Sequence, residues 1–329
     1  MDIKDKKILY YLSQDSRLSH TQLSKKVALS KNAVKYRIKR LQKEGIITKF
    51  AAVVNLGALN LTTVTLLLKF NEDIYEKPEI IDYFKNHEMA DWVITLSGQW
   101  DIFVELVSKD FLHLDKIISE IIQHFSESLN TYQLFFSRDT LRVEHLITDF
   151  YKNLGLEEPA QKQRTEEIHT IDETDKKILQ VLNEDSSLPF LQIAQKTGLT
   201  MDIVRYRIKH LLEKGIIIKF FSEISLPKLG YTEYLYWIKL KNVSKEKMER
   251  IKKRISTDKN ITYAYTDLTS SNIMFVCAYD SPEGIDHLSR GLRKEYSEIL
   301  EKQEYLIIKE QVLFNLFPTG LVKQADAAR

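Results

Sequence analysis

The sequence has a single cysteine, Cys277, among 329 residues, and it contains no long uninterrupted apolar run. One cysteine excludes an intramolecular disulfide framework. This cysteine lies in the apolar run 273–278, so we expect a buried small side chain rather than a reactive thiol. No stretch approaches the roughly 18 apolar residues of a membrane helix, and the charged N-terminus does not resemble a secretory signal. These absences predict a cytoplasmic protein that does not enter the membrane.

The common catalytic and cofactor motifs are also missing. The chain has no Gly-x-Gly-x-x-Gly turn, no Walker loop, no Gly-x-Ser-x-Gly motif and no His-Glu-x-x-His motif. Its 8 histidines are scattered and form no Cys/His cluster with metal-ligand spacing. The sequence therefore predicts no catalytic residue, no cofactor and no metal site, which favours a protein that is not an enzyme.

Positive charge is concentrated at one end of the chain, although the whole chain is close to neutral. The formal net charge is +2, from 48 Lys and Arg against 46 Asp and Glu. Residues 1–50 carry 13 basic and 4 acidic residues, whereas residues 171–220 carry 8 and 7. A basic segment of this kind is typical of nucleic-acid contact, and the alternative is a solvated basic face without a partner.

The first 50 residues recur once, at an offset of 170 residues. The segment DKKIL at 5–9 returns at 175–179, YRIK at 36–39 returns at 206–209, and GII at 45–47 returns at 215–217. About half of the aligned positions are identical and no gap is needed. Chance does not produce such a match, so the chain contains an internal duplication.

Each copy has the pattern of three short helices followed by a strand. In the first copy, Asp2 can cap the first helix, Ser19 and Gln22 form a capping box that opens the second, and Ser30 caps the third. Gly45 can end the third helix in the left-handed conformation, and residues 46–50 then favour one strand of a hairpin. This pattern predicts a winged helix-turn-helix. The expected buried stripes are Ile8, Leu9, Leu12, Leu23, Val27, Val34, Ile38 and Leu41.

Downstream of each such unit, the hydrophobic pattern predicts the order βαββαβ of a ferredoxin-like domain. The fold class is therefore α+β, with two tandem units, each a winged helix-turn-helix followed by a ferredoxin-like βαββαβ domain. After the first unit we expect strands at 64–70, 92–96, 102–107, 132–136 and 141–147, and helices at 76–86 and 110–125. After the second we expect strands at 234–240, 261–266, 272–279 and 303–313, and helices at 244–256 and 282–298.

These patterns divide the chain into five segments. Two winged helix-turn-helix units are predicted at 1–60 and 171–226, and two ferredoxin-like domains at 61–150 and 227–318. The segment 151–170 between the copies is polar and charged with few large apolar residues, which favours a moderately flexible linker.

The repeated motifs resemble the Lrp/AsnC family of prokaryotic, especially archaeal, transcription regulators. The resemblance rests on DKKIL at 5–9, the turn Leu29-Ser30, GII at 45–47 and their counterparts in the second copy. It covers nearly the whole chain and implies double-stranded DNA as the partner. It also implies dimerisation, and hence self-association, through the ferredoxin-like domains.

The turn Gly98-Gln99-Trp100-Asp101 resembles the Gly-x-aromatic-Asp turn of the ligand-sensing domain in this family, with Trp in place of the more usual Tyr. The resemblance implies an amino acid or another small molecule as effector, bound near Gly98, Trp100 and Asp101. The alternative interpretation is a structural hairpin with a capped turn. The second copy departs from the pattern, because residues 267–272 lack both the glycine and the aromatic residue.

The third helix of the first copy is expected to enter the major groove of DNA. Ser30 and Lys31 at its start favour phosphate binding, because the helix N-terminus carries partial positive charge. Asn32 and Lys35 are candidates for contacts with base edges. The remaining candidates are Tyr36, which is alternatively packed against the first helix, Arg37 and Arg40, which hold either phosphate or a neighbouring carboxylate, and Lys39. Backbone contacts are further expected from Lys25, Lys26 and Lys49.

The second copy offers a weaker set of DNA-binding candidates. Met201 and Asp202 stand where the first copy has Lys31 and Asn32, and a carboxylate there repels phosphate. DNA contact by this copy and a role only in pairing with the first copy are both open. The basic and aromatic residues that remain are Arg205, Tyr206, Arg207 and Lys209.

Together these observations predict a sequence-specific DNA-binding transcription regulator that acts as a single-chain pseudo-dimer. One alternative is an enzyme resembling the siroheme decarboxylases, which share this fold. It is disfavoured because the basic residues gather on the first recognition helix rather than on the ferredoxin-like domains. The other alternative is a protein-interaction scaffold that uses winged helices without DNA.

Overall fold

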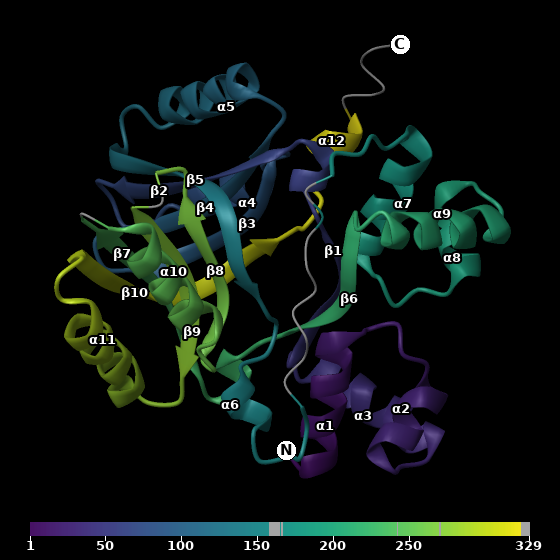
Figure 1. Cartoon of the computed structure of the whole chain (residues 1–329). Coiled ribbons are helices and arrows are strands. Elements are labelled where there is room, and N and C mark those ends of the chain that lie inside the picture. The colour runs from purple at the N-terminus through teal and green to yellow at the C-terminus, as the bar shows by residue number, and fades with distance from the viewer. Residues whose placement is uncertain (158–164, 166, 242, 270, 324–329) are drawn as a thin grey trace. The chain divides into compact units, whose positions relative to one another are not determined.

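The computed structural model describes residues 1–157, 165, 167–241, 243–269 and 271–323 (Figure 1). The chain divides into two compact units. Unit 1 consists of residues 1–49, 137–161 and 221–308, and unit 2 of residues 50–136, 162–220 and 309–329. Each helix-turn-helix therefore shares a unit with the ferredoxin-like strands of the other copy. Part of the predicted linker, residues 158–164 and 166, lies outside the described residues.

The first head, which we define as residues 1–46, contains α1 (Ile3–Gln14), α2 (His20–Val27) and α3 (Lys31–Lys43). The three predicted caps are confirmed, because Asp2, Ser19 and Ser30 each accept a hydrogen bond from a backbone N–H three residues on. Gly45 has a φ of +69° and ends α3 as predicted. The expected stripe is buried throughout, at Ile8, Leu9, Leu12, Leu23, Val27, Val34, Ile38 and Leu41.

The second head, residues 171–216 of unit 2, repeats this arrangement with α7 (Glu173–Glu184), α8 (Phe190–Thr197) and α9 (Met201–Glu213). The turn before the third helix contains a left-handed residue in both heads. That residue is Ala28 in the first head, with a φ of +51°, and Gly198 in the second, with a φ of +70°. Only glycine adopts this conformation without a steric cost, so the two turns differ in strain although both are left-handed.

The strand after each head does not fold back into a hairpin of its own. β1 (Ile47–Val54) and β6 (Ile217–Ile224) form a two-stranded sheet instead. In unit 1 the Ser225 N–H donates to the Ile46 carbonyl at 2.9 Å, and in unit 2 the Asn55 N–H donates to the Ile216 carbonyl at 2.8 Å. The predicted hairpin is therefore wrong. Residues 50–54 are all buried, and the chain continues through the short helix Gly57–Leu59 rather than through a hairpin turn, so the matching strand of the other copy supplies the hydrogen-bond partners.

Unit 2 contains the first ferredoxin-like domain, which follows the short helix η1 (Gly57–Leu59). Its strands are neighbours in the order β3-β4-β2-β5 and all pair antiparallel, as the βαββαβ fold requires. The last part of β10, residues 309–314, lies beside β3, and Trp92 Nε1 donates to Gln311 Oε1 at 3.1 Å. The elements are β2 (Thr62–Phe70), α4 (Pro78–Lys85), β3 (Ala90–Ser97), β4 (Ile102–Ser108), α5 (Phe111–His124) and β5 (Leu129–Val143).

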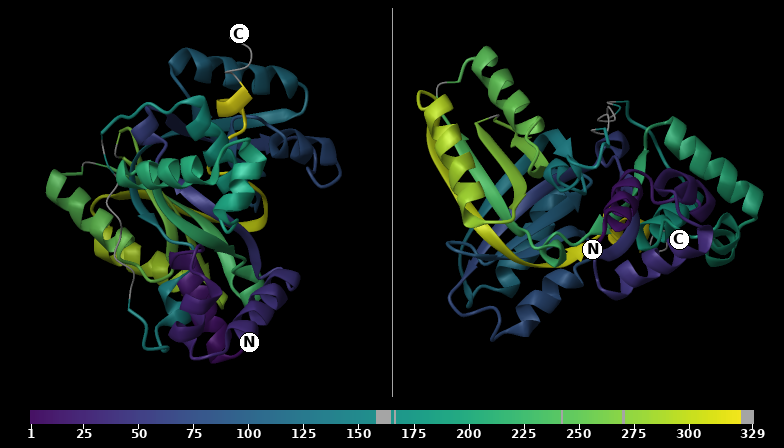
Figure 2. Two further views of the ribbon diagram at one scale, coloured as in Figure 1. Left: turned by 90° about the vertical axis from the view of Figure 1, so that its right-hand side faces the viewer. Right: turned by 90° about the horizontal axis from the view of Figure 1, so that it is seen from below.

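Unit 1 contains the second ferredoxin-like domain, which follows η2 (Pro227–Leu229). Its strands have the order β8-β9-β7-β10, and residues 137–143 of β5 pair with β8. The helices α10 and α11 lie on one face of these strands (Figure 2) and bury Ile251, Leu288 and Phe275 between the layers. The elements are β7 (Thr232–Leu240), α10 (Lys245–Ser256), β8 (Ile261–Asp267), β9 (Asn272–Tyr279), α11 (Pro282–Tyr296) and β10 (Leu300–Phe314).

The predicted pair of strands at 132–136 and 141–147 is wrong, because β5 is one strand over Leu129–Val143. Its polar middle, Ser137 to Thr140, has the composition of a turn. Residues 129–136 pair with β2, whereas residues 137–143 pair with β8 through two register shifts. The polar residues stay in the strand because the irregular pairing with β8 still supplies hydrogen-bond partners for their backbone N–H and C=O groups.

Short helices complete both units. In unit 1, α6 (Thr148–Tyr151) packs on α1, with the rings of Tyr10 and Tyr151 4.8 Å apart, and the Thr148 N–H donates to the Lys259 carbonyl at 2.8 Å. These contacts tie the first head to the second ferredoxin-like domain. In unit 2, α12 (Gly320–Lys323) packs on α7. Among the described residues, none of the helices has the length and apolar character that a membrane span requires.

Candidate DNA-binding surface

The outer face of α3 carries a row of lysines with free side chains. The inner stripe, Val34, Ile38 and Leu41, is buried against α1 and α2, so residues four apart on the opposite side point into solvent. Lys31, Lys35 and Lys39 occupy that side, and within the described part of the chain they make no ion pair. We call these three residues the lysine row.

The neighbours of the lysine row are also accessible. Asn32 is exposed, and Tyr36 is 67% exposed, so Tyr36 does not pack against α1. The charge of the row acts on His20 at the start of α2. Burial first, and then the positive charges of Lys35 and Lys31, lower the pKa of His20. Ser30 is exposed but uses its hydroxyl to cap α3, accepting from the Ala33 N–H at 3.1 Å.

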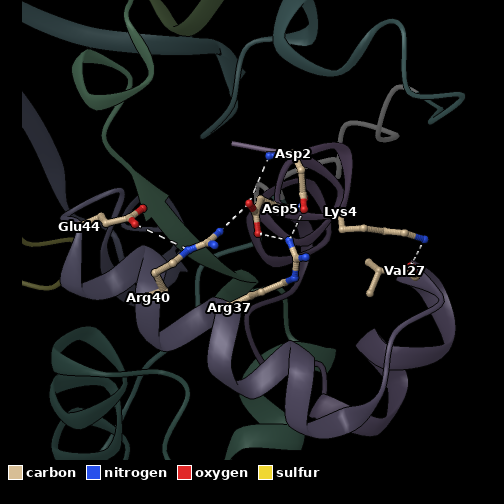
Figure 3. Close-up of polar contacts among 7 residues, drawn as sticks. All are labelled: Asp2, Lys4, Asp5, Val27, Arg37, Arg40 and Glu44. Carbon is tan, nitrogen blue, oxygen red and sulfur yellow. Dashed lines mark hydrogen bonds and ion pairs between the residues drawn. The ribbon is translucent and has the colours of Figure 1, made fainter.

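Arg37 and Arg40 hold carboxylates at the start of α1 (Figure 3). Arg37 Nη1 lies 2.6 Å from Asp2 Oδ2 and 2.8 Å from Asp5 Oδ1, and Arg40 Nη2 lies 2.5 Å from Asp5 Oδ2. Asp5 is only 1% exposed. Of the two alternatives that the sequence left for these arginines, the structure shows the carboxylate.

This cluster of ion pairs braces α3 against α1. The backbone N–H of Asp5 and the Arg37 guanidinium lower the pKa of Asp2, so the carboxylate is ionised at neutral pH. Lys4 Nζ donates to the Val27 carbonyl at 2.6 Å and ties α1 to the end of α2 (Figure 3). The brace fixes the direction in which α3 presents the lysine row.

The basic residues outside α3 are placed less uniformly. Lys25 and Lys26 are exposed at the end of α2, and Lys26 Nζ lies 4.8 Å from the centre of the Tyr11 ring. Lys49 is half-buried in β1.

In the second head, every cation on α9 faces an acid. Arg207 pairs with Asp172 at 2.8 Å, which repeats the brace of the first head. Arg205 lies 3.8 Å from Asp202, and Lys209 lies 3.6 Å from Glu213, both on the same helix. The local field toward DNA is therefore weaker than at the lysine row. Tyr206 is 64% exposed and stacks on His210.

The second head also exposes apolar side chains on α8 and α9, and of these only Met201 was considered from the sequence. Met201, at the position of Lys31, is 40% exposed, and Ile203, at the position of Ala33, is 42% exposed. Leu191, at the position of Thr21, is 57% exposed. An alignment of the two copies at the offset of 170 residues shows these replacements, so the sequence alone was sufficient to find them.

The turn at 98–101 is held by its aspartate. Asp101 accepts from Lys69 Nζ at 2.7 Å and from the Phe70 N–H at 2.8 Å, and Gly98 has a φ of +138°. Trp100 is 8% exposed, and its indole N–H is buried with no hydrogen-bond partner among the described residues. The turn thus combines a carboxylate that accepts two hydrogen bonds, Asp101, with a buried donor that has no partner among the described residues, the Trp100 indole N–H.

The two remaining expectations concern metal ligands and the cysteine. The described residues contain no group of three or more His, Cys, Asp or Glu that would hold a metal ion. Cys277 is fully buried, as predicted, and burial raises the pKa of its thiol.

Comparison with known proteins supports the assignment of the two heads. A family model described as winged helix-turn-helix DNA-binding matches residues 1–48, and the AsnC-type helix-turn-helix domain matches residues 171–212. The solved structure of the siroheme decarboxylase NirDL shares the fold over 99% of both chains, with a TM-score of 0.63 and 14% identity.

Curated relatives cover part of the chain at higher identity. An uncharacterized HTH-type transcriptional regulator of Pyrococcus furiosus is 33% identical over 122 residues, which are 36% of this chain and 81% of the relative. The HTH-type transcriptional regulator LrpA of Pyrococcus horikoshii is 48% identical over 62 residues, 19% of this chain and 44% of the relative. The chain therefore belongs to the Lrp/AsnC family of helix-turn-helix transcriptional regulators.

Proposed function

We propose that this DNA-binding transcription regulator contacts duplex DNA chiefly through the first head, with α3 in the major groove. The observation that supports this is the lysine row, three exposed cations one turn apart without a competing carboxylate. Lysines so placed neutralise phosphates and release counterions. The alternative is a solvated basic face without a partner. We favour DNA contact because the two arginines of α3, Arg37 and Arg40, pair with a carboxylate in the brace, whereas the lysines of the row do not.

Within this surface we assign different roles to different residues. Ser30 and Lys31, at the start of α3, contact phosphate, where the helix dipole adds to the lysine charge. Asn32 and Lys35 reach base edges, because Asn matches adenine and Lys matches the acceptors of guanine. Tyr36 and Lys39 extend the contact along the groove. Arg37 and Arg40 act on DNA only indirectly, by orienting α3.

We propose that the second head makes a weaker contact, through Arg205, Tyr206 and Lys209, while Arg207 serves as its brace. One chain then supplies two unlike heads, and its operators are not palindromic. A footprint showing a perfect palindrome covered by two chains, each through its first head alone, would contradict this single-chain arrangement.

For the turn at 98–101 we propose an amino acid or similar small molecule as effector, near Gly98, Trp100 and Asp101. The support is the buried indole N–H of Trp100, which a ligand carboxylate or carbonyl would satisfy. Calorimetry of the full chain against the amino acids tests this, with Trp100→Phe as the variant that removes the donor. Absence of heat with all of them leaves the turn as a structural hairpin.

The decisive experiment is selection of duplex DNA from a random pool by the full chain. We expect an enriched sequence that Lys35→Gln with Lys39→Gln no longer retains, whereas Arg205→Gln with Lys209→Gln, at the matching positions of the second head, retains it in weakened form. Failure to enrich any sequence would overturn the proposal. A parallel titration with iron-uroporphyrin III tests the enzyme of the same fold, since tetrapyrrole binding without DNA binding would favour that alternative.

A further inference from the structure

The second ferredoxin-like domain contains a polar cavity between α11 and β10. Neither of these elements belongs to a head. Its volume is about 250 Å³, and all of it lies within unit 1. This is somewhat below the volume of pockets for drug-sized ligands, roughly 300 Å³ and more, and suits a small metabolite. The lining residues are Asp286, Ser289, Arg290 and Arg293 from α11 and Gln303 from β10.

Two buried oxygen atoms at this place have no hydrogen-bond partner among the described residues. Gln303 donates through Nε2 to the Ser289 carbonyl at 3.1 Å and to Ser289 Oγ at 2.8 Å, which fixes its amide, yet its Oε1 is buried and unsatisfied. On the adjacent strand, Tyr236 is 0% exposed and its hydroxyl is also unsatisfied. Burial raises the pKa of the Tyr236 phenol to about 12, and the neighbouring Ser289 side chain acts in the opposite direction.

Unsatisfied buried oxygens of this kind are rare in folded proteins, because each loses its hydrogen bonds to water on burial. Gln303 Oε1 can only accept, so a ligand that satisfies it must offer an O–H or N–H group. This requirement excludes simple anions such as chloride as the intended occupant.

The charges of the lining residues specify the rest of the ligand. Arg290 and Arg293 are exposed, one turn apart, and make no ion pair within the described part of the chain. Guanidinium groups bind carboxylates in a planar, two-pronged geometry. Asp286 lies at the other end of the lining on α11, where Tyr305 donates to it at 3.4 Å.

The first copy of the domain serves as an internal comparison. α5 and α11 align at an offset of 171, because their buried positions correspond, for example Leu114 with Ile285 and Ile121 with Leu292. At this offset, Ile118 and Ile122 of α5 stand where Ser289 and Arg293 stand in α11. Leu66 of β2 likewise stands where β7 has Tyr236, at the offset of 170 that relates these two strands.

Packing of the helix on the sheet therefore needs only apolar residues at these positions, as the first copy shows. The buried hydroxyl of Tyr236 and the guanidinium of Arg293 in the second copy therefore serve something other than packing. We propose that the cavity between α11 and β10 binds a small carboxylate that also carries a hydroxyl or ammonium donor. The carboxylate lies on Arg290 and Arg293, and the donor lies on Gln303 Oε1.

The test uses the full chain and two probes, L-malate for the hydroxyl source and L-glutamate for the ammonium source, with inorganic phosphate as comparator. We expect saturable binding of at least one probe in titration calorimetry and a rise in Tm. Arg290→Gln with Arg293→Gln should weaken that binding at least tenfold. Lys294→Gln, which removes an exposed charge from the same helix outside the lining, should leave it unchanged.

Gln303→Leu separates a binding role from a structural one. If the cavity binds a donor, this variant loses affinity at least tenfold, and its Tm without ligand falls only slightly, because the two hydrogen bonds to Ser289 are lost together with the unsatisfied oxygen. A lower Tm with unchanged affinity would overturn the proposal. So would the absence of saturable binding by either carboxylate, or phosphate binding as tightly as both and insensitive to Gln303→Leu. The proposed carboxylate site does not depend on DNA binding. The ligand titration and the DNA selection therefore test separate proposals.

Discussion

Replacing the lysine row with Lys31→Gln, Lys35→Gln and Lys39→Gln should change how DNA affinity depends on salt. Each neutralised phosphate contributes about 0.9 to the slope of log K against log salt on duplex DNA. Three free lysines therefore predict a slope smaller by about 2.7 in the triple variant. Between 50 and 200 mM salt, the wild type should lose about 40-fold more affinity than the variant. Fluorescence anisotropy with a labelled duplex over that salt range measures both slopes.

The comparison variant in the second head is Arg205→Gln with Lys209→Gln, at the positions of Lys35 and Lys39, since the position of Lys31 holds Met201. Its slope should change by less than about 0.9, because Asp202 at 3.8 Å and Glu213 at 3.6 Å already offset these cations. The inference from exposure and ion pairing would be refuted if both variants lost the same slope. It would also be refuted if the triple variant bound DNA like the wild type at every salt concentration.

Three further predictions concern stability. Ala28→Gly should stabilise the chain by about 0.5–1 kcal/mol, and Gly198→Ala should destabilise it by a similar amount, because both positions are left-handed. A thermal melt in which the two variants shift Tm in the same direction would contradict this. Burial raises the pKa of Asp175, and His210→Arg, which restores the arginine found at the matching position of the first head, should lower that pKa and add about 1 kcal/mol, as an NMR titration and a melt can check. Burial, and then the charge of a neighbouring glutamate, raises the pKa of Glu233 to about 7, so its ionisation removes stability as pH rises from about 4.5 to 7. Glu233→Gln should therefore raise Tm by about 3 °C at pH 8 and change it little at pH 4, and a larger gain at pH 4 would reverse the assigned sign.

The sequence by itself determined the local elements and the difference between the two heads. Caps such as Ser19 with Gln22, and the end of α3 at Gly45, act over three or four residues, so their chemistry is legible without the fold. The surplus of positive charge in the first copy was equally visible. The role of Arg37 was predicted only as one of two alternatives, because its carboxylate partner Asp2 lies on a different helix.

Only the tertiary structure decided which strands pair and which ferredoxin-like domain each head packs with. β1 and β6 carry nearly the same local signals, since they are copies, and no local signal states that they pair with each other rather than within their own heads. β5 remains one strand because two different neighbours, β2 and β8, satisfy its two halves. Hydrogen-bond partners that are distant in sequence settle these choices, and a duplicated chain offers every strand two nearly equivalent sets of them.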